Sequence, residues 1–408
     1  MKFLHIADLH LVKQVADFSM LEDQRFILRE ILSMIDFRHP DAVVVAGDLY
    51  DKPVPPADAV TLLDWFITEL SEREIPLLII SGNHDSPERL EFGSGIFKQK
   101  GIYFAGRFQG APKKVTLSAK ENPSDQADFY LLPFIRPANV RPFYPDEEIK
   151  SYDDAMRCVI RSLSLSEEYP SVLIAHQFVT AGGVSPERSD SEILSLGGTD
   201  NVDVSNFLPF QYVALGHIHR PQRLTRESVR YAGSPLKYSF SEAAYAKSAV
   251  FVTLRGMEEP EIELLPLTPL HDMRRIKGPL ENLIREETVR AADPEDYLHV
   301  TLTDTEPVSD PMFRLRQVYP NIMRLEYEGN SSENIDSPEE EEVEHKTPPR
   351  LFADFYRQMM GKDLSEEDKA LVLSLMDEVW AGERAQAAQA AQAAQADAEE
   401  NGKGEDEA

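Results

Sequence analysis

The stretch Ala42-Val-Val-Val-Ala-Gly-Asp-Leu-Tyr-Asp51 joins an uninterrupted apolar run to a glycine and two carboxylates. A short apolar run that ends in a turn signal is typical of a strand buried on both faces. The helical apolar spacing of residues 57–73 follows, and a second apolar run at residues 75–80 leads into Gly82-Asn-His-Asp85. This order predicts an α/β fold in which polar groups follow buried strands.

The same alternation extends over the first two thirds of the chain. Because the expected strands are continuously apolar, both faces of their sheets should be covered. Strands are expected at residues 2–7, 41–46, 75–80, 171–175 and 211–215, and helices at residues 22–37 and 57–73.

From residue 268 the elements are shorter and follow a β-α-β-α-β order, which predicts a small separate α+β domain. Its strands are expected at residues 273–277, 297–303 and 322–327, and its helices at residues 279–288 and 311–318.

The C-terminal part has three distinct compositions. An acidic, proline-bearing segment predicts an extended linker, two short helical patterns predict a hairpin, and an Ala/Gln repeat predicts a disordered tail. Ser365-Glu-Glu-Asp368 is a capping-box variant that begins the second helix. The predicted domains are a core (1–267), a cap (268–330), the linker (331–349), the hairpin (350–384) and the tail (385–408).

The composition limits the location and the partners. The net charge is −29, and residues 331–408 alone hold 21 acidic and 7 basic residues, which argues against strong unaided binding to phosphate backbones. No apolar run approaches the ~18 residues of a membrane span, and the first residues lack the apolar core of a secretory signal. The single cysteine, Cys158, excludes a disulfide framework and is expected to be buried in a helix. We therefore expect a cytoplasmic protein.

Five expected strands are each followed at once by side chains that can bind a metal. Taken alone, each motif is weak, because a histidine after a strand is usually structural and Gly-Asp is a common turn. Together they predict one site, since the carboxyl ends of parallel strands meet at one edge of a sheet. The residues are Asp8 and His10, Asp48 and Asp51, Asn83, His84 and Asp85, His176, and His217 and His219.

The donor types narrow the choice of metal. Imidazole, carboxylate and amide groups without thiolate suit Mn, Fe or Zn. Seven donors are too many for one open ion but fit two ions ~3.5–4 Å apart that share a carboxylate. Gly47, Gly82 and Gly216 each stand before a donor, where the backbone can approach closely.

The ordered series of motifs resembles the calcineurin-like metallophosphoesterases, a family whose fold is a β-sandwich flanked by helices. The resemblance implies that Asp48 bridges two metals, and that His84 binds no metal and stabilises or protonates the leaving oxygen. It implies one site completed by Asp8, His10 and His219, and another completed by Asn83, His176 and His217. Asp85 either orients His84 or simply begins a helix, and Asp51 is given no catalytic role.

Two longer stretches, Ser81–Leu90 and Tyr231–Glu242, resemble the SbcD family, the nuclease subunits of bacterial SbcCD exonucleases. The resemblance covers roughly residues 1–380. It implies a Mn²⁺-dependent DNA nuclease that trims double strands from 3′ to 5′, cuts single strands and hairpins, and acts in DNA repair, recombination and replication. It also implies an SbcC-type coiled-coil ATPase partner, docked through the hairpin, and a homodimer within a heterotetramer.

Alternatives to this hypothesis remain at the level of sequence. The core motifs also fit a small-molecule metallophosphodiesterase or nucleotidase, or a scaffold that keeps its metals for stability, and the hairpin could fold back on its own core. An acidic nuclease can bind DNA largely through its partner protein and its metal ions. Candidate phosphate contacts, each equally explained as a surface charge, are Arg89, Lys237, Arg274, Arg275 and Lys277.

Overall fold

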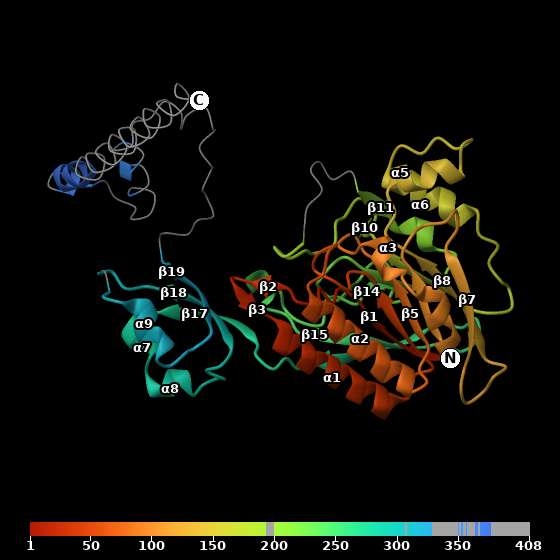
Figure 1. The fold of residues 1–408 in the computed structure, drawn as a ribbon, viewed down its shortest axis with the longest axis horizontal. Coiled ribbons are helices and arrows are strands. Elements are labelled where there is room, and N and C mark those ends of the chain that lie inside the picture. The colour runs from red at the N-terminus through yellow and green to blue at the C-terminus, as the bar shows by residue number, and fades with distance from the viewer. Residues whose placement is uncertain are drawn as a thin grey trace, which may run out of the picture. The chain divides into compact units, whose positions relative to one another are not determined.

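The computed structural model describes residues 1–192, 200–306 and 308–328, and, nearer the C-terminus, residues 350, 352–353, 356, 364–365 and 368–376. The chain divides into two compact units (Figure 1). The larger contains Met1–Ile276, Glu281–Val300 and Asp310–Arg324, and the smaller contains Lys277–Leu280, Thr301–Ser309 and Leu325–Ala408. Among the described helices, none has the length and apolar character needed to span a bilayer.

The larger unit is built on two six-stranded sheets. The first sheet consists, in spatial order, of β16 (Glu261–Leu267), β15 (Lys247–Thr253), β1 (Lys2–Ile6), β4 (Ala42–Ala46), β5 (Leu77–Ile80) and β6 (Ile102–Ala105). Strands β1, β4, β5 and β6 are parallel, whereas β15 and β16 are antiparallel to their neighbours. The parallel strands therefore end at one edge of this sheet.

The second sheet also contains four parallel strands, with one antiparallel strand at each edge. It consists of β13 (Gln222–Arg223), β14 (Val229–Tyr231), β12 (Tyr212–Gly216), β9 (Ser171–His176), β8 (Gln126–Leu132) and β7 (Lys113–Ser118). The four inner strands are parallel, and the two edge strands are antiparallel to them.

The two sheets pack face to face, which confirms the expected β-sandwich. Phe3 of the first sheet contacts Phe129 and Tyr212 of the second, with ring centroids 5.4 Å apart in both pairs. Helices α1 (Leu21–Arg38) and α2 (Ala57–Glu72) cover the outer face of the first sheet, and α6 (Tyr152–Arg161) covers the second (Figure 1). All five residues of β4 are consequently buried, as its continuous apolar sequence predicts.

The expected β-α-β-α-β order near residue 300 is present, with one correction. Strands β17 (Met273–Gly278), β18 (Tyr297–Leu302) and β19 (Ile322–Tyr327) form a three-stranded sheet, and α9 (Pro311–Arg316) precedes β19. The single helix expected over residues 279–288 is wrong. It is split into α7 (Leu280–Leu283) and α8 (Glu286–Val289), because Arg285 between them has an extended backbone (φ −63°, ψ 139°).

Short elements complete the described chain. They are β2 (Gln14–Val15), β3 (Phe18–Ser19), α3 (Pro87–Leu90), α4 (Ser94–Phe97), η1 (Lys98–Lys100), α5 (Pro137–Val140), η2 (Arg141–Phe143), β10 (Phe178–Thr180), β11 (Asn201–Asp203), η3 (Val204–Phe207) and η4 (Phe240–Glu242). Cys158 lies in α6 and is half-buried, not buried as expected.

Much of the expected C-terminal organisation lies outside the described residues. This holds for the linker (331–349), the tail (385–408) and most of the hairpin (350–384). Residues 368–376 are helical, and the Ser365 hydroxyl accepts a hydrogen bond from the Asp368 N–H at 3.1 Å, as the capping-box pattern predicts.

Candidate metal centre

The seven predicted metal donors come from both sheets of the sandwich. Three of the loops that carry them follow β1, β4 and β5 of the first sheet, and the other two donor segments are the last residue of β9 and the loop after β12 of the second. Gly216 pairs directly with His176 in the second sheet, so His176 and His217 reach the same edge. The structure thereby brings together Asp8, His10, Asp48, Asn83, His176, His217 and His219.

Four of these seven residues have a left-handed backbone conformation. The φ angles are 54° for Asp8, 42° for His10, 50° for Asp48 and 103° for His217. Non-glycine residues in this region cost ~1–3 kcal/mol each and are concentrated at functional sites. Main-chain bonds hold the strain in place, since the Asp8 N–H donates to Gly47 O at 3.1 Å and the His10 N–H to Asp48 O at 3.0 Å.

Glycine is required where these loops meet. Gly47 has a φ of +87°, and a Cβ atom on Gly82 would lie 2.0 Å from Oδ1 of Asp48. A side chain at residue 82 would therefore displace the central carboxylate of the cluster.

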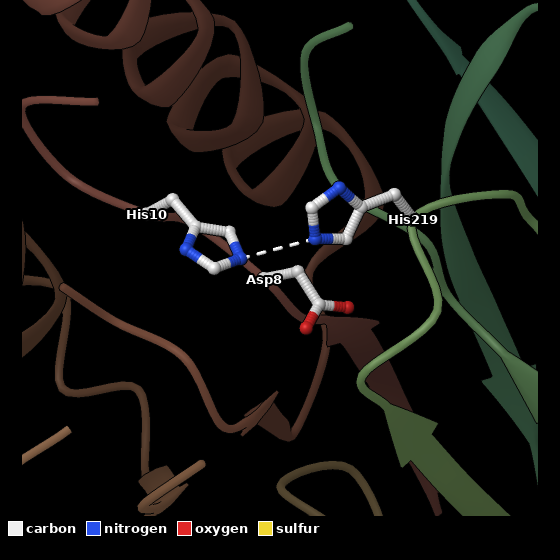
Figure 2. A group of neighbouring side chains, drawn as sticks. All are labelled: Asp8, His10 and His219. Carbon is white, nitrogen blue, oxygen red and sulfur yellow. Dashed lines mark hydrogen bonds between the residues drawn. The ribbon is translucent and has the colours of Figure 1, made fainter. Parts of the chain in front are cut away.

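One donor group consists of Asp8, His10 and His219 (Figure 2). The Nε2 atoms of the two imidazoles face each other at 3.0 Å, with the Asp8 carboxylate beside them. Oδ1 of Asp8 accepts the His217 N–H at 2.9 Å, whereas its buried Oδ2 has no hydrogen-bond partner in the described chain. Burial raises the pKa of Asp8 to about 7. A buried carboxylate oxygen without a partner fits a bound cation.

A second donor group surrounds Asn83. Its Oδ1 lies 3.0 Å from His176 Nε2 and 2.9 Å from His217 Nδ1. His176 Nδ1 donates to the Ala46 carbonyl at 2.8 Å, because a carbonyl can only accept. This leaves Nε2 of His176 directed at the centre, where it can ligate a metal once it gives up its proton.

Asp48 lies between the two groups. Its Oδ2 is 3.6 Å from His10 Nε2 and 3.3 Å from His176 Nε2, and its Oδ1 accepts the His84 N–H at 3.0 Å. Burial opposes the charged form of both Asp48 and His176. The charge on His176 nevertheless holds the pKa of Asp48 well below its usual value, and Asp48 with Asp8 raises the pKa of His176 to about 9. This position is the one expected of a shared carboxylate.

His84 approaches the centre from the half-exposed side. Its ring lies edge-on to His10 at a centroid distance of 4.9 Å, and one of its nitrogens is within 4.8 Å of donor atoms of His10 and Asp48. Nδ1 of His84 donates to the main-chain oxygen of Asp51 at 3.0 Å, and Nε2 makes no hydrogen bond with the described residues. Asp51, for which no catalytic role is expected from the motifs, thus orients this ring, while its carboxylate pairs with Lys13 at 2.7 Å.

Asp85 organises main chain and does not contact the His84 ring among the described residues. Its carboxylate accepts N–H groups from Gly82 (2.9 Å), Leu49 (3.2 Å) and Tyr50 (3.0 Å). It therefore ties the loop after β4 to the loop after β5, a role that neither of the sequence interpretations included.

A buried polar network behind His219 was not predicted from the sequence. The Ser191 hydroxyl lies 2.7 Å from His219 Nδ1 and donates to Glu242 Oε1 at 2.7 Å. Lys247 Nζ donates to Glu242 Oε2 at 2.6 Å and to the His219 carbonyl at 2.7 Å. Because Ser191 donates to Glu242, its oxygen accepts from Nδ1–H of His219 and leaves Nε2 facing His10. Groups that fix a ligand's tautomer in this way tune metal affinity.

Most of the candidate phosphate contacts are already paired. Lys237 binds Asp272 at 2.7 Å, Arg274 binds Asp296 at 2.5 Å, and Lys277 binds Glu328 at 2.5 Å. Arg275 donates to the Phe240 carbonyl at 3.1 Å, and Arg89 is exposed.

Comparison with known proteins gives matches over both parts of the chain. Residues 1–221 match the family model described as calcineurin-like phosphoesterase, and residues 269–360 match one described as type 5 capsule protein repressor C-terminal domain. The SbcD subunit of nuclease SbcCD from Staphylococcus epidermidis is 33% identical over 371 residues, which cover 90% of this chain and 95% of the relative. The corresponding protein of Staphylococcus saprophyticus is 33% identical over 383 residues, covering 92% and 98%.

Among solved structures, a dimetal phosphatase from Danio rerio is 14% identical and covers 66% of this chain and 99% of its own, with a TM-score of 0.37. The phosphoesterase fold implies divalent metal ions, and the donor groups described above fit them. The match over residues 1–221, together with one third identity over nine tenths of the chain, establishes that this chain belongs to the calcineurin-like phosphoesterases and, within them, to the SbcD family of SbcCD nuclease subunits.

Proposed function

We propose that this chain is a metal-dependent DNA nuclease, the SbcD-type subunit of an SbcCD complex, that hydrolyses phosphodiester bonds with two divalent ions. The observation that carries the proposal is the convergence of seven donors from two sheets around a buried carboxylate oxygen without a partner. The similarity to nuclease subunits along most of the chain supports DNA as the substrate.

The two donor groups suggest how the ions are held. Asp8, His10 and His219 would hold one ion, Asn83, His176 and His217 would hold the other, and Asp48 would serve both. Imidazole, carboxylate and amide donors suit Mn²⁺. When bound, two such ions polarise the phosphoryl oxygen and lower the pKa of an attacking water.

The chain's own contribution to the reaction is proton transfer and positioning. His84, with Nδ1–H fixed on the Asp51 carbonyl, presents Nε2 on the half-exposed side of the centre. In its protonated form Nε2 donates a proton to the leaving oxygen. The Glu242–Ser191 pair holds the His219 ring in the tautomer that its place in the centre requires.

The finer activities and the assembly follow the family. We expect 3′-to-5′ exonuclease activity on double strands and endonuclease activity on single strands and hairpins, in DNA repair, recombination and replication. A coiled-coil ATPase of the SbcC type would bind the helix at residues 368–376, where Leu371 and Leu375 are exposed. The working assembly would be a homodimer within a heterotetramer.

The proposal is tested with purified full-length chain, Mn²⁺ and end-labelled linear DNA. His84→Asn should lower the cleavage rate by about 100-fold or more, because general acid catalysis contributes ~10²–10⁴-fold. The matched control is His39→Asn, since His39 is exposed and has a left-handed backbone (φ 48°) that asparagine accepts. Equal rates for the His84→Asn variant and the parent would refute the role of His84.

The same protein should also hydrolyse bis(p-nitrophenyl) phosphate with Mn²⁺. Turnover of this small diester without cleavage of DNA, even with the ATPase partner added, would overturn the assignment to DNA in favour of a small-molecule phosphodiesterase.

A further inference from the structure

The Asn83 side of the metal centre opens into a hollow of about 250 Å³. Gly82, Asn83 and Asp85 form the wall that it shares with the centre, and Arg107, Phe134 and Arg136 line the rest of it together with neighbouring side chains. Because Asn83 Oδ1 also faces His176 and His217, a group that lies in this hollow is next to the reacting position.

Phe134 and Arg136 form a stacked pair in this hollow. The Arg136 guanidinium lies over the Phe134 ring, 5.5 Å from its centroid. Arg136 is exposed and Phe134 is half-buried. Aromatic rings and guanidinium planes are the surfaces on which unpaired bases stack.

A second hollow of about 450 Å³ adjoins the first, and Arg107 lines both. Lys113 lines the second hollow, and its Nζ donates to the Phe104 carbonyl at 3.0 Å. Burial and the nearby charge of Lys98 lower the pKa of Lys113. Lys98 and Lys113 therefore place two positive charges close together beside the second hollow.

The acidic groups of this region only partly compensate these charges. Oε1 of Glu91 accepts the N–H groups of Gly106 (3.1 Å) and Arg107 (3.2 Å), and its other oxygen is 3.6 Å from the Arg107 side chain. Glu88 lines the first hollow and is exposed. The chain as a whole is acidic, with a net charge of −29. The arginine and lysine side chains beside the metal centre therefore form a locally basic surface, which favours an anionic ligand.

We propose that the two adjoining hollows form a path for a single nucleic-acid strand, in which Phe134 and Arg136 stack a base beside the metal centre while Arg107 and Lys113 contact the next phosphates. This inference rests on the proposed function, because the path would lead the DNA substrate to the same metal centre. A single strand, unlike a duplex, leaves the faces of its bases open to stack on an aromatic ring or a guanidinium plane.

The test measures strand binding without cleavage. A fluorescent 12-nucleotide oligothymidine and a 12-base-pair duplex are titrated with full-length chain in EDTA at several salt concentrations. For Arg107→Ala/Arg136→Ala, the slope of log K against log salt for the single strand should become shallower by about 0.7, because the variant loses the phosphate contact of Arg107 and one such contact contributes ~0.7. For Phe134→Leu, single-strand affinity should fall by about fivefold or more, since a stacked base contributes at least ~1 kcal/mol.

The matched control is Arg223→Ala/Arg255→Ala. It removes the same charge from two exposed arginines that pair with Glu227 and Glu261 away from the hollows, and its salt slope should equal that of the parent chain. Equal slopes for the two double variants, an equal loss of duplex and single-strand affinity, or no measurable strand binding by the parent would each overturn the path.

Hydrolysis of bis(p-nitrophenyl) phosphate with Mn²⁺ separates this inference from the proposed function. The small diester reports on the metal centre alone, so the control variant Arg223→Ala/Arg255→Ala, whose substitutions lie away from the hollows, should hydrolyse it at the parent's rate. A parent chain that fails to hydrolyse it refutes the proposed chemistry, whereas a parent that hydrolyses it but shows no change in strand binding on substitution refutes only the path.

Discussion

His5 on β1 and Asp8 just after it are both buried polar side chains, but burial has a different consequence for each. The Asp8 carboxylate is buried, and one of its oxygens has no hydrogen-bond partner among the described residues, which costs stability unless a cation is bound. His5 is also fully buried, with Nδ1 3.0 Å from the Tyr212 hydroxyl and no partner for Nε2 in the same part of the chain. The carboxylate suits a metal site, whereas the imidazole is simply kept neutral.

The burial of His5 predicts that the folded protein loses stability in mild acid. Burial, together with the charge of Arg230, lowers its pKa to about 3 from 6.5. The unfolded chain therefore takes up a proton below pH 6.5 that the folded chain refuses, so the free energy of unfolding falls as the pH drops. Between pH 7.5 and 5.0 the parent should lose about 2 kcal/mol more than His5→Phe. Urea unfolding at both pH values measures the difference, and identical pH dependence of the two proteins would contradict it.

At the scale of elements, the segment from β14 to β15 acts as a support for the centre. Its Glu242 is held by Lys247 and Ser191. Within the described chain, Glu242 forms no hydrogen bond or ion pair with Asp8 or His10, the two donors that share the first group with His219. Burial would raise the pKa of Glu242, but the Lys247 ammonium holds it well below its usual range. The carboxylate therefore stays charged behind His219.

Removing that charge should weaken metal binding. Glu242→Gln leaves Lys247 buried without a counter-charge and loosens Ser191, so we expect Mn²⁺ affinity to fall about 10–100-fold and stability to fall by about 3–5 kcal/mol. Calorimetric titration with Mn²⁺ and urea unfolding measure the two effects.

The double variant Glu242→Gln/Lys247→Met separates the effect on Mn²⁺ affinity from the effect on stability. Without the unpaired lysine, stability should largely recover, whereas Mn²⁺ affinity should stay low. Full recovery of both quantities would show that the network only stabilises the fold.

The sequence predicts the elements that carry the donors better than those that support them. Strands β1, β4, β5, β9 and β12 lie within two residues of their expected positions, because an apolar run followed by a polar motif is a local signal. Strands β8, β15 and β16 were not predicted. Phe3, for example, pairs with Val252, and no local pattern encodes a partner that distant. The supporting roles of Asp51, Asp85 and Glu242 were missed for the same reason, since their bonds exist only after the loops meet.

At the scale of the whole molecule, the net charge of −29 works against strong DNA binding by the chain alone, and the C-terminal helix offers a surface for a partner protein. Leu371 and Leu375, four residues apart, are 59% and 52% exposed, and Leu373 is 47% exposed on another side of the helix. The i, i+4 spacing places the first two on one face.

A charge on that face should prevent docking. Leu371→Asp should weaken binding to the coiled-coil ATPase by about 30-fold, as expected for a ~2 kcal/mol anchor. Leu373→Asp carries the same charge on the other side of the helix and should bind like the parent. Calorimetry with the purified ATPase measures both, and equal affinities for the two variants would contradict docking through this face.

The division of the donors between two sheets also bears on when activity can arise. A chain that stops before β12 carries five of the seven donors and lacks His217 and His219. A polypeptide still on the ribosome, or one released early, therefore has no complete centre, and aborted synthesis should not release a fragment able to damage the genome of the cell that made it.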